Sequence, residues 1–146
     1  MNDLRIYFKK LSNKTKTPEY SKRGDACCDL SIIEDYIIRP GDIILARTGF
    51  AIAMPEGFEA QIRPRSGLAL KGLFVLNSPG TIDSSYRGEV KIILTNLGKQ
   101  MISLKEGDRV AQMKFSVVFT GHFLDVGDNE LDNTERGSGG FGHTGF

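Results

Sequence analysis

Residues 108–119 read DRVAQMKFSVVF, and the spacing of their apolar residues decides the fold. Ala111, Met113, Phe115 and Val117 occupy every second position, and polar residues stand between them. Successive side chains of a β-strand point to opposite faces, so a period of two puts these four residues on one face. The stretch therefore predicts a strand that packs one face against a core.

Four further segments show apolar alternation with enrichment in β-branched residues. They are LRIYF (4–8), DIILARTGFAIAM (42–54), GFEAQIRP (57–64) and EVKIILTNL (89–97). Turn sequences such as PGD, PEG, NLGK and KEGD separate the segments. Strands joined by turns predict an all-β sandwich, jelly roll or barrel. Residues 66–71, SGLALK, are the exception and predict one short helical turn.

The 146 residues suffice for one domain, and a hydrophobic content of 40% suffices for a core. Strand-like alternation ends near residue 120, which predicts a β-domain over residues 1–120 and a C-terminal connection and arm over residues 121–146. The arm ends in RGSGGFGHTGF (136–146). So glycine-rich a sequence buries too little apolar surface to offset its ordering entropy, which predicts a flexible arm.

Charge and hydropathy exclude two classes of partner. The formal net charge is only +1, so we expect no nucleic-acid partner and no membrane partner. No apolar run approaches the roughly 18 to 20 residues of a membrane span, and the polar start MNDLRIYFKK lacks the apolar core of a secretory signal. We therefore expect a cytoplasmic location.

The two cysteines, Cys27 and Cys28, are adjacent in the sequence. Adjacent residues are poorly placed for a disulfide with each other, and two thiols are too few for a structural zinc site. We therefore expect both thiols to be reduced and buried.

Residues 77–89, NSPGTIDSSYRGE, place Asp83 and Tyr86 between two strand-like runs. The segment thus combines a turn-forming Pro-Gly pair with an acid, a tyrosine and an arginine. The alternative is a plain hairpin, in which Pro79 and Gly80 form a type II turn and Tyr86 packs on the sheet.

A possible anion site follows in residues 63–69, RPRSGLA. The planar guanidinium of Arg65 suits phosphate oxygens, and the hydroxyl of Ser66 and the amides near Gly67 offer further donors. The alternative is an arginine that is simply solvated, since the segment does not match the phosphate-binding loop of P-loop proteins.

The segment of residues 107–113, GDRVAQM, contains two candidate polar residues, Arg109 and Gln112. The odd spacing of Arg109 and Gln112 predicts that they point to opposite faces of a strand. Asp29, in GDACCDL, stands among small and apolar residues, and burying a carboxylate without a partner is costly. Capping of nearby backbone is the alternative role for Asp29.

Taken in order, five segments resemble the five motifs of the trimeric deoxyuridine triphosphate nucleotidohydrolases, the dUTPase family. They are DACCDL (25–30), PRSGLA (64–69), GTIDSSYRGE (80–89), GDRVAQ (107–112) and RGSGGFGHTG (136–145). The resemblance implies a jelly-roll-like distorted β-barrel with at most one short helix, assembled as a homotrimer whose active sites are shared between subunits. It also implies hydrolysis of dUTP to dUMP and pyrophosphate by water attack on the α-phosphorus, with Mg²⁺ as cofactor.

Matched position by position, the resemblance implies a role for each site residue. Asp83 would hold the attacking water as base, Gln112 of a neighbouring subunit would contact that water, and Asp29 would reach Mg²⁺ through a water. The glycine-rich arm would close over the site as a lid. The implied substrate-binding residues are Arg65, Ser66, Gly67, Asn77, Gly80, Thr81, Ile82, Tyr86, Arg136, Ser138, Gly139, Gly140 and Phe141.

Two rival hypotheses remain at this stage. A dCTP deaminase of the same structural superfamily would act on a related nucleotide and release ammonia. A catalytically silent β-trimer would use the nucleotide pocket as a regulatory or protein-binding surface. Asp83, Tyr86 and the glycine-rich arm together favour the hydrolase, whose reaction would limit uracil in DNA and supply dUMP for thymidylate synthesis.

Overall fold

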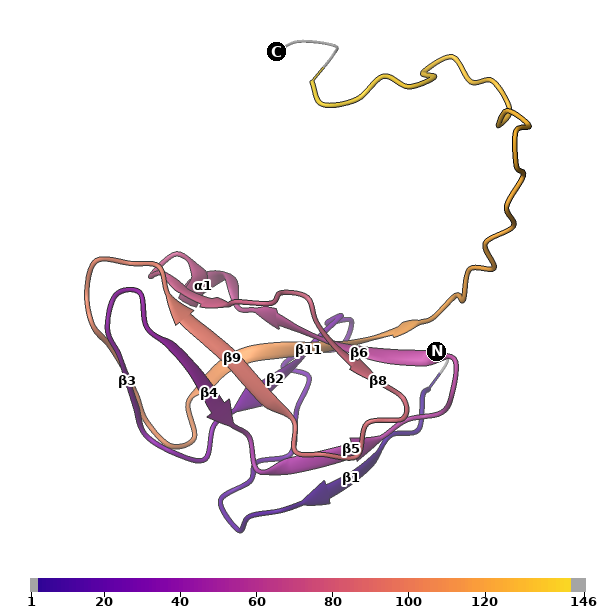
Figure 1. Ribbon diagram of the computed structural model, residues 1–146. Coiled ribbons are helices and arrows are strands. Elements are labelled where there is room, and N and C mark those ends of the chain that lie inside the picture. The colour runs from indigo at the N-terminus through magenta and orange to yellow at the C-terminus, as the bar shows by residue number, and fades with distance from the viewer. Residues whose placement is uncertain (1–2, 143–146) are drawn as a thin grey trace.

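The computed structural model describes residues 3–142. Within them the fold contains strands and a single four-residue helix, α1 (Ser66–Ala69), as the alternation predicted (Figure 1). The strands are β1 (Tyr7–Lys10), β2 (Cys28–Ser31), β3 (Tyr36–Ile38), β4 (Ile43–Arg47), β5 (Phe50–Ala53), β6 (Phe58–Pro64), β7 (Leu73–Val75), β8 (Gly80–Asp83), β9 (Lys91–Asn96), β10 (Ile102–Leu104) and β11 (Arg109–Val117).

The strands form four antiparallel sheets around one core. The largest has the order β2-β11-β6-β8, a second has the order β4-β9-β7, and two ribbons pair β1 with β5 and β10 with β3. Neighbouring strands within the larger sheets lie far apart in sequence, so connections cross between sheets. This is the arrangement of a jelly-roll-like distorted barrel, and the predicted fold class is confirmed.

The core lies between the two larger sheets. Leu30, Ile62 and Met113 reach it from the four-stranded sheet, and Ile92 and Leu94 reach it from the three-stranded sheet. Each of these side chains is at most 4% exposed. Burial of this kind stabilises a fold by about 1.5 to 3 kcal/mol per large aliphatic side chain.

The alternation of β11 holds over most of the strand. Ala111 and Met113 are buried, and Phe115 is half-buried against the core. Val117, the last residue of β11, is 58% exposed, because the strand runs past the core and leads into the C-terminal arm (Figure 1). The core face of β11 therefore ends one apolar residue earlier than the sequence predicted.

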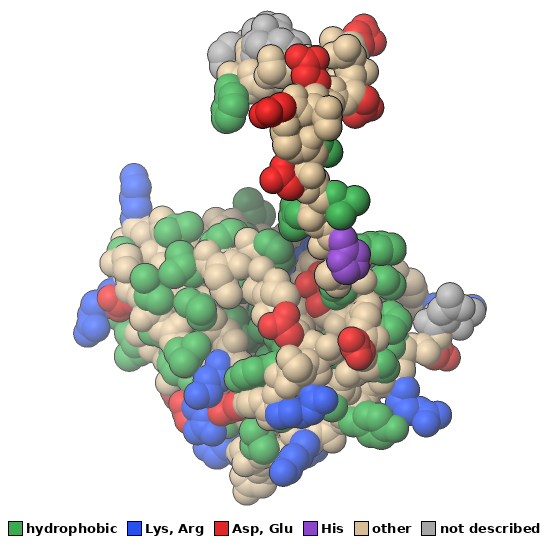
Figure 2. All heavy atoms as spheres, turned by 45° about the vertical axis from the view of Figure 1, so that its right-hand side comes forward, with side chains coloured by type: hydrophobic (Ala, Val, Ile, Leu, Met, Phe, Trp, Pro, Cys, Tyr) green, Lys and Arg blue, Asp and Glu red, His purple; other side chains and the backbone are tan. Residues whose placement is uncertain are grey.

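After β11 the described chain forms no helix or strand and extends away from the body (Figure 1). In Figure 2 the arm rises from the body as a narrow stalk. Several large apolar side chains after β11 are exposed, namely Phe119, Phe123, Leu124, Leu131 and Phe141. Residues 143–146 of the predicted arm lie outside the described residues. No helix among residues 3–142 is long and apolar enough to cross a membrane.

Both cysteines are free thiols, as predicted, but only Cys28 is buried. Cys27 is half-buried, because it lies in the bend just before β2, whose first residue Cys28 is the one that reaches the core. The Cys28 Sγ lies 3.4 Å from the backbone oxygen of Met113. Burial raises the pKa of the Cys28 thiol to about 11.

We predict that this thiol makes folding stability depend on alkaline pH. In the folded protein the pKa of Cys28 lies above its ordinary value of 9.0. The contribution of the neutral, buried thiol to the free energy of unfolding is therefore complete below about pH 9 and is lost as pH rises towards 11. The loss should approach about 2 to 3 kcal/mol, since one pKa unit corresponds to ~1.4 kcal/mol. Urea unfolding of the protein and of Cys28→Ala at pH 8, 10 and 11 measures it. Parallel pH dependence in the two proteins would contradict the prediction.

Candidate active site

A hollow of about 430 Å³ lies beside α1, and its charged lining residues are Arg65, Asp25 and Asp29. The chain changes from strand to helix beside this hollow: β6 ends at Pro64, Arg65 keeps an extended backbone, and α1 begins at Ser66. This change places the hydrogen-bond donors of Arg65 and Ser66 at the hollow. Across the hollow, Asp29 of β2 lies opposite Gln112 of β11 in the sheet register. The predicted site residues that line this phosphate-side hollow are Asp29, Arg65, Ser66, Gly67 and Gln112.

Asp29 lies between two arginines. Its Oδ1 is 3.1 Å from Arg65 Nε, and its Oδ2 is 2.9 Å from Arg109 Nη1. Arg65 Nη1 also donates to the backbone oxygen of Arg109 at 2.8 Å. The Asp29 side chain is only 15% exposed, and these contacts compensate its charge. They also hold the Arg65 guanidinium in one orientation at the edge of the hollow.

The prediction that Arg109 and Gln112 point to opposite faces is wrong. The Arg109 side chain bonds Asp29, and Asp29 is the direct cross-strand partner of Gln112. The pairing of β11 with β2 shifts register between Arg109 and Ala111, so Val110 is an extra residue and the alternation is reset. Both polar side chains therefore reach the same outer face, and Gln112 Nε2 is fixed there by the Pro64 oxygen at 2.9 Å.

The donor set fits an indirect metal role for Asp29. Among residues 3–142, no three carboxylate, histidine or cysteine side chains gather so as to hold a metal ion directly. Both oxygens of Asp29 already accept from arginines, which leaves its remaining lone pairs for a water molecule. Mg²⁺ usually keeps several of its own waters, so one carboxylate can reach it through such a water.

A second hollow, of about 390 Å³, is lined by residues of the third matched segment, GTIDSSYRGE (80–89). β8 supplies its floor, with Gly80 and Ile82 buried and Thr81 and Asp83 exposed. A Cβ on Gly80 would lie 3.2 Å from Asn77 Nδ2, so the amide of Asn77 packs closely against the strand. The predicted residues of this nucleoside-side hollow are Asn77, Gly80, Thr81, Ile82, Asp83 and Tyr86.

The alternative of a plain type II turn at Pro79 and Gly80 does not occur. That turn needs a positive φ at its third residue, whereas Gly80 opens strand β8 and its φ is not positive. The chain turns further along, where the Tyr86 amide donates to the Asp83 oxygen at 3.1 Å, and β8 pairs with β6 and not with the following strand β9.

Asp83 and Gln112 share the outer face of the sheet but lie far apart on it. Asp83 faces Glu59 of β6, and Gln112 faces Arg63 on the opposite edge of β6. Four residues at ~3.3 Å along the strand and two strand spacings of ~4.8 Å across it separate them by roughly 16 Å. One water cannot bond both side chains, because each bond spans about 3 Å. Within one chain they cannot act on the same water.

The arm residues join neither hollow in this chain. Figure 1 shows the arm far from α1 and β8. Arg136 Nε donates instead to the Gly139 oxygen at 2.8 Å, and Phe141 is fully exposed. The neighbouring predicted residues Ser138 and Gly140 lie in the same extended segment.

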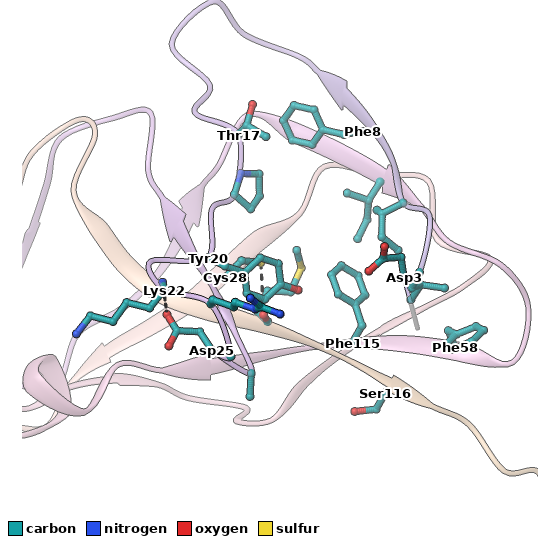
Figure 3. A pocket seen from close by; sticks show the side chains of 18 of the residues that line it. Asp3, Phe8, Thr17, Tyr20, Lys22, Asp25, Cys28, Phe58, Phe115 and Ser116 are labelled. Carbon is teal, nitrogen blue, oxygen red and sulfur yellow. Dashed lines mark hydrogen bonds between the residues drawn. The ribbon is translucent and has the colours of Figure 1, made fainter. Parts of the chain in front are cut away.

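A third hollow, of about 780 Å³, escaped sequence reasoning (Figure 3). Rings from four different segments line it, those of Phe8, Tyr20, Phe58 and Phe115. None of the predicted site residues lines it, although Asp25 and Ala26 border both this apolar hollow and the phosphate-side hollow. No sequence signal joins these aromatics, because they lie far apart along the chain and meet only in the fold.

Comparison with known sequences identifies the family. The dUTPase family profile matches residues 13–145. A deoxyuridine 5'-triphosphate nucleotidohydrolase of Desulfotalea psychrophila is 52% identical over 131 residues, which cover 88% of this chain and 86% of the relative. The enzyme of that name from Hydrogenobaculum sp. is 48% identical over 145 residues, which cover 98% of this chain and 99% of the relative.

Solved structures agree in fold. A mutant dUTPase of Staphylococcus bacteriophage 80alpha with dUpNHpp superposes with a TM-score of 0.89 at 23% identity, covering 97% of this chain and 99% of that one. A mutant dUTPase from phage phi11 of S. aureus, whose structure describes a structural Mg(II) ion, gives 0.80 at 22%, covering 87% and 99%. The profile match and the relatives about half identical over most of the chain show that this chain belongs to the dUTPase family.

Proposed function

We propose that this protein is a dUTP diphosphatase that hydrolyses dUTP to dUMP and pyrophosphate by attack of water on the α-phosphorus. The observation that carries the proposal is the separation of a nucleoside-side hollow ending at Asp83 from a phosphate-side hollow holding Arg65, on a chain of the dUTPase family. A nucleoside triphosphate has the same two parts. The relatives carry the name of this activity.

The nucleoside-side hollow suits a deoxyuridine. Backbone groups of residues 80–82 and the amide of Asn77 present donors and acceptors to the uracil edge. A strand backbone is stiff, so a close fit there excludes the 5-methyl group of thymine. Tyr86 lies beside this strand, where its ring would cover the deoxyribose and leave no room for a 2′-hydroxyl.

Asp83 acts as the base. It is exposed at the end of β8, where its carboxylate can accept a hydrogen bond from a water and orient that water towards the α-phosphorus. A base in this position typically contributes ~10²- to 10⁴-fold to the rate. The rest of the acceleration comes from neutralising charge on the triphosphate, for which Arg65, Ser66 and the amide of Gly67 are the donors.

The complete site is shared between subunits of a homotrimer. Asp83 and Gln112 lie roughly 16 Å apart in one chain, so both can reach one water only if they come from different copies. A closed ring of three copies repeats one such interface and builds three equal sites.

Mg²⁺ is the proposed cofactor. When bound to the triphosphate it withdraws charge from the phosphate oxygens and so assists the attack of water. Asp29 would bind the ion through one of the ion's waters, because each of its carboxylate oxygens already pairs with Arg65 or Arg109. In this arrangement Asp29 links the cation to the arginine that meets the phosphates.

The glycine-rich arm is the proposed lid of a site on a neighbouring copy. Phe141 would stack on the uracil, Arg136 would meet the phosphates, and Ser138 with the amides of Gly139 and Gly140 would donate to phosphate oxygens. Both ends of the substrate would then contact one short segment. We place the reaction in the cytoplasm, where dUMP feeds thymidylate synthesis and removal of dUTP limits uracil in DNA.

We predict that Asp83→Asn abolishes pyrophosphate release from dUTP, lowering kcat by at least ~10²-fold, because the amide cannot accept the proton of the water. The measurement is pyrophosphate release by the assembled enzyme under saturating Mg²⁺. The matched control is Asp42→Asn, since Asp42 caps the turn before β4, where its Oδ2 accepts from the Arg39 amide, and lines neither hollow.

The same assay separates the rival functions. With dTTP, dCTP and UTP as competitors, only dUTP should be consumed efficiently. Ammonia release from dCTP would support the deaminase instead. Absence of pyrophosphate release from dUTP by the unaltered, correctly assembled protein would support the catalytically silent trimer.

We predict that substrate orders the arm. Amide hydrogen exchange over residues 136–142 should be fast in the free enzyme and clearly slowed by the non-hydrolysable analogue dUpNHpp, because the contacts that hold the arm form only with the ligand. Residues 102–104 of β10, which line neither hollow, provide an internal reference in the same experiment. Equal protection of the arm with and without dUpNHpp would contradict a lid.

A further inference from the structure

The ring of Tyr86 is held by the backbone that follows it. Its Oη donates to the Glu89 backbone oxygen at 3.0 Å. The ring also lies directly on Gly88, where a Cβ would come within 2.4 Å of Oη. The position of Tyr86 in the nucleoside-side hollow therefore depends on the path of residues 88 and 89.

Glu89 is in turn anchored from the opposite side, through its carboxylate. Oε1 accepts from the Gly49 amide at 2.9 Å, and Arg47 Nε lies 3.2 Å from each oxygen. The Glu89 side chain is only 12% exposed, so solvent cannot replace these partners. One residue thus presents its carbonyl to Tyr86 and its carboxylate to Arg47.

Arg47 is itself held by the strands behind it. Its Nη1 lies 3.0 Å from Glu34 Oε1, and its backbone amide donates to the Tyr36 Oη at 2.9 Å. Tyr36 Oη donates to the other oxygen of Glu34 at 2.9 Å. The guanidinium therefore bridges two carboxylates and cannot swing away from Glu89 without breaking both ion pairs.

We propose that Arg47 is a positioning residue that acts through Glu89 to fix the ring of Tyr86, and that it thereby sets the preference for deoxyribose over ribose. The inference rests on the proposed function, in which Tyr86 covers the sugar. Arg47 lies outside all five matched motifs and lines neither hollow of the site. Its effect reaches the substrate only through the backbone of Glu89.

The test compares kcat and KM for dUTP and UTP in Arg47→Gln and Arg47→Lys. Arg47→Gln should lower the ratio of the two kcat/KM values by about tenfold or more, because a small displacement of a positioning contact has large kinetic effects. Arg47→Lys should lower it less, since lysine keeps the charge but loses the planar fork. In Tyr86→Phe, which lacks the anchoring hydroxyl, the further effect of Arg47→Gln should be smaller than in the unaltered protein.

Lys105→Gln is the matched control. It also breaks an ion pair, between Lys105 Nζ and Asp35 Oδ2 at 2.9 Å, but this pair is exposed and has no contact with Glu89. The dUTP-to-UTP ratio of this variant should stay unchanged. A general loss of stability would lower activity on both substrates equally and leave the ratio intact.

An unchanged ratio in folded Arg47→Gln would overturn the proposal. If that variant does not fold, Glu89→Gln decides by the same ratio, since it keeps the carbonyl but weakens the pairing with Arg47. If the unaltered protein does not hydrolyse dUTP, the proposed function has failed. Sugar preference in the binding of dUpNHpp against its ribose counterpart then tests Arg47 independently.

Discussion

Strand β6 fixes the distance between the two halves of the site. Asp83 pairs across one edge of this strand, and Gln112 pairs across the other, four residues further along. The ladder of backbone hydrogen bonds makes that separation rigid, so no rotation of side chains brings the two together. The proposed assembly, arm closure and sharing of sites would meet this constraint, because a triphosphate bound to one half would find its other contacts on another chain.

Much of the fold could be predicted from the sequence because burial acts on a local pattern. Alternation places Ala111 and Met113 in the core, and Ser66–Ala69 forms the one expected helical turn. The extra residue at Val110 could not be found in this way, since a bulge is defined by the partner strand and not by the pattern. It is this bulge that turns Arg109 towards Asp29.

For the candidate site, too, the residues could be predicted from the sequence but the contacts that hold them could not. Its residues could be named from motifs, and the structure gathers those outside the arm into two hollows. The ion pairs that hold them could not be predicted, because Asp29 and Arg109 are separated by 80 residues and Arg47 and Glu89 by 42. Contacts at such separations depend on strand order, which a single sequence does not reveal. Ordering the eleven residues that end the arm costs roughly 10 to 20 kcal/mol, so several simultaneous contacts are needed to hold it in one place.

Complementation between inactive variants tests most directly whether each site is shared. Asp83→Asn lacks the base, and the double variant Arg65→Ala with Gln112→Ala lacks the phosphate-side contacts. When the two are unfolded, mixed in equal amounts and refolded together, one site in about four should combine an intact Asp83 with an intact phosphate side from another copy, restoring about a quarter of the activity. If the mixed assemblies form but remain as inactive as either parent, each site is built within one chain and the account is contradicted.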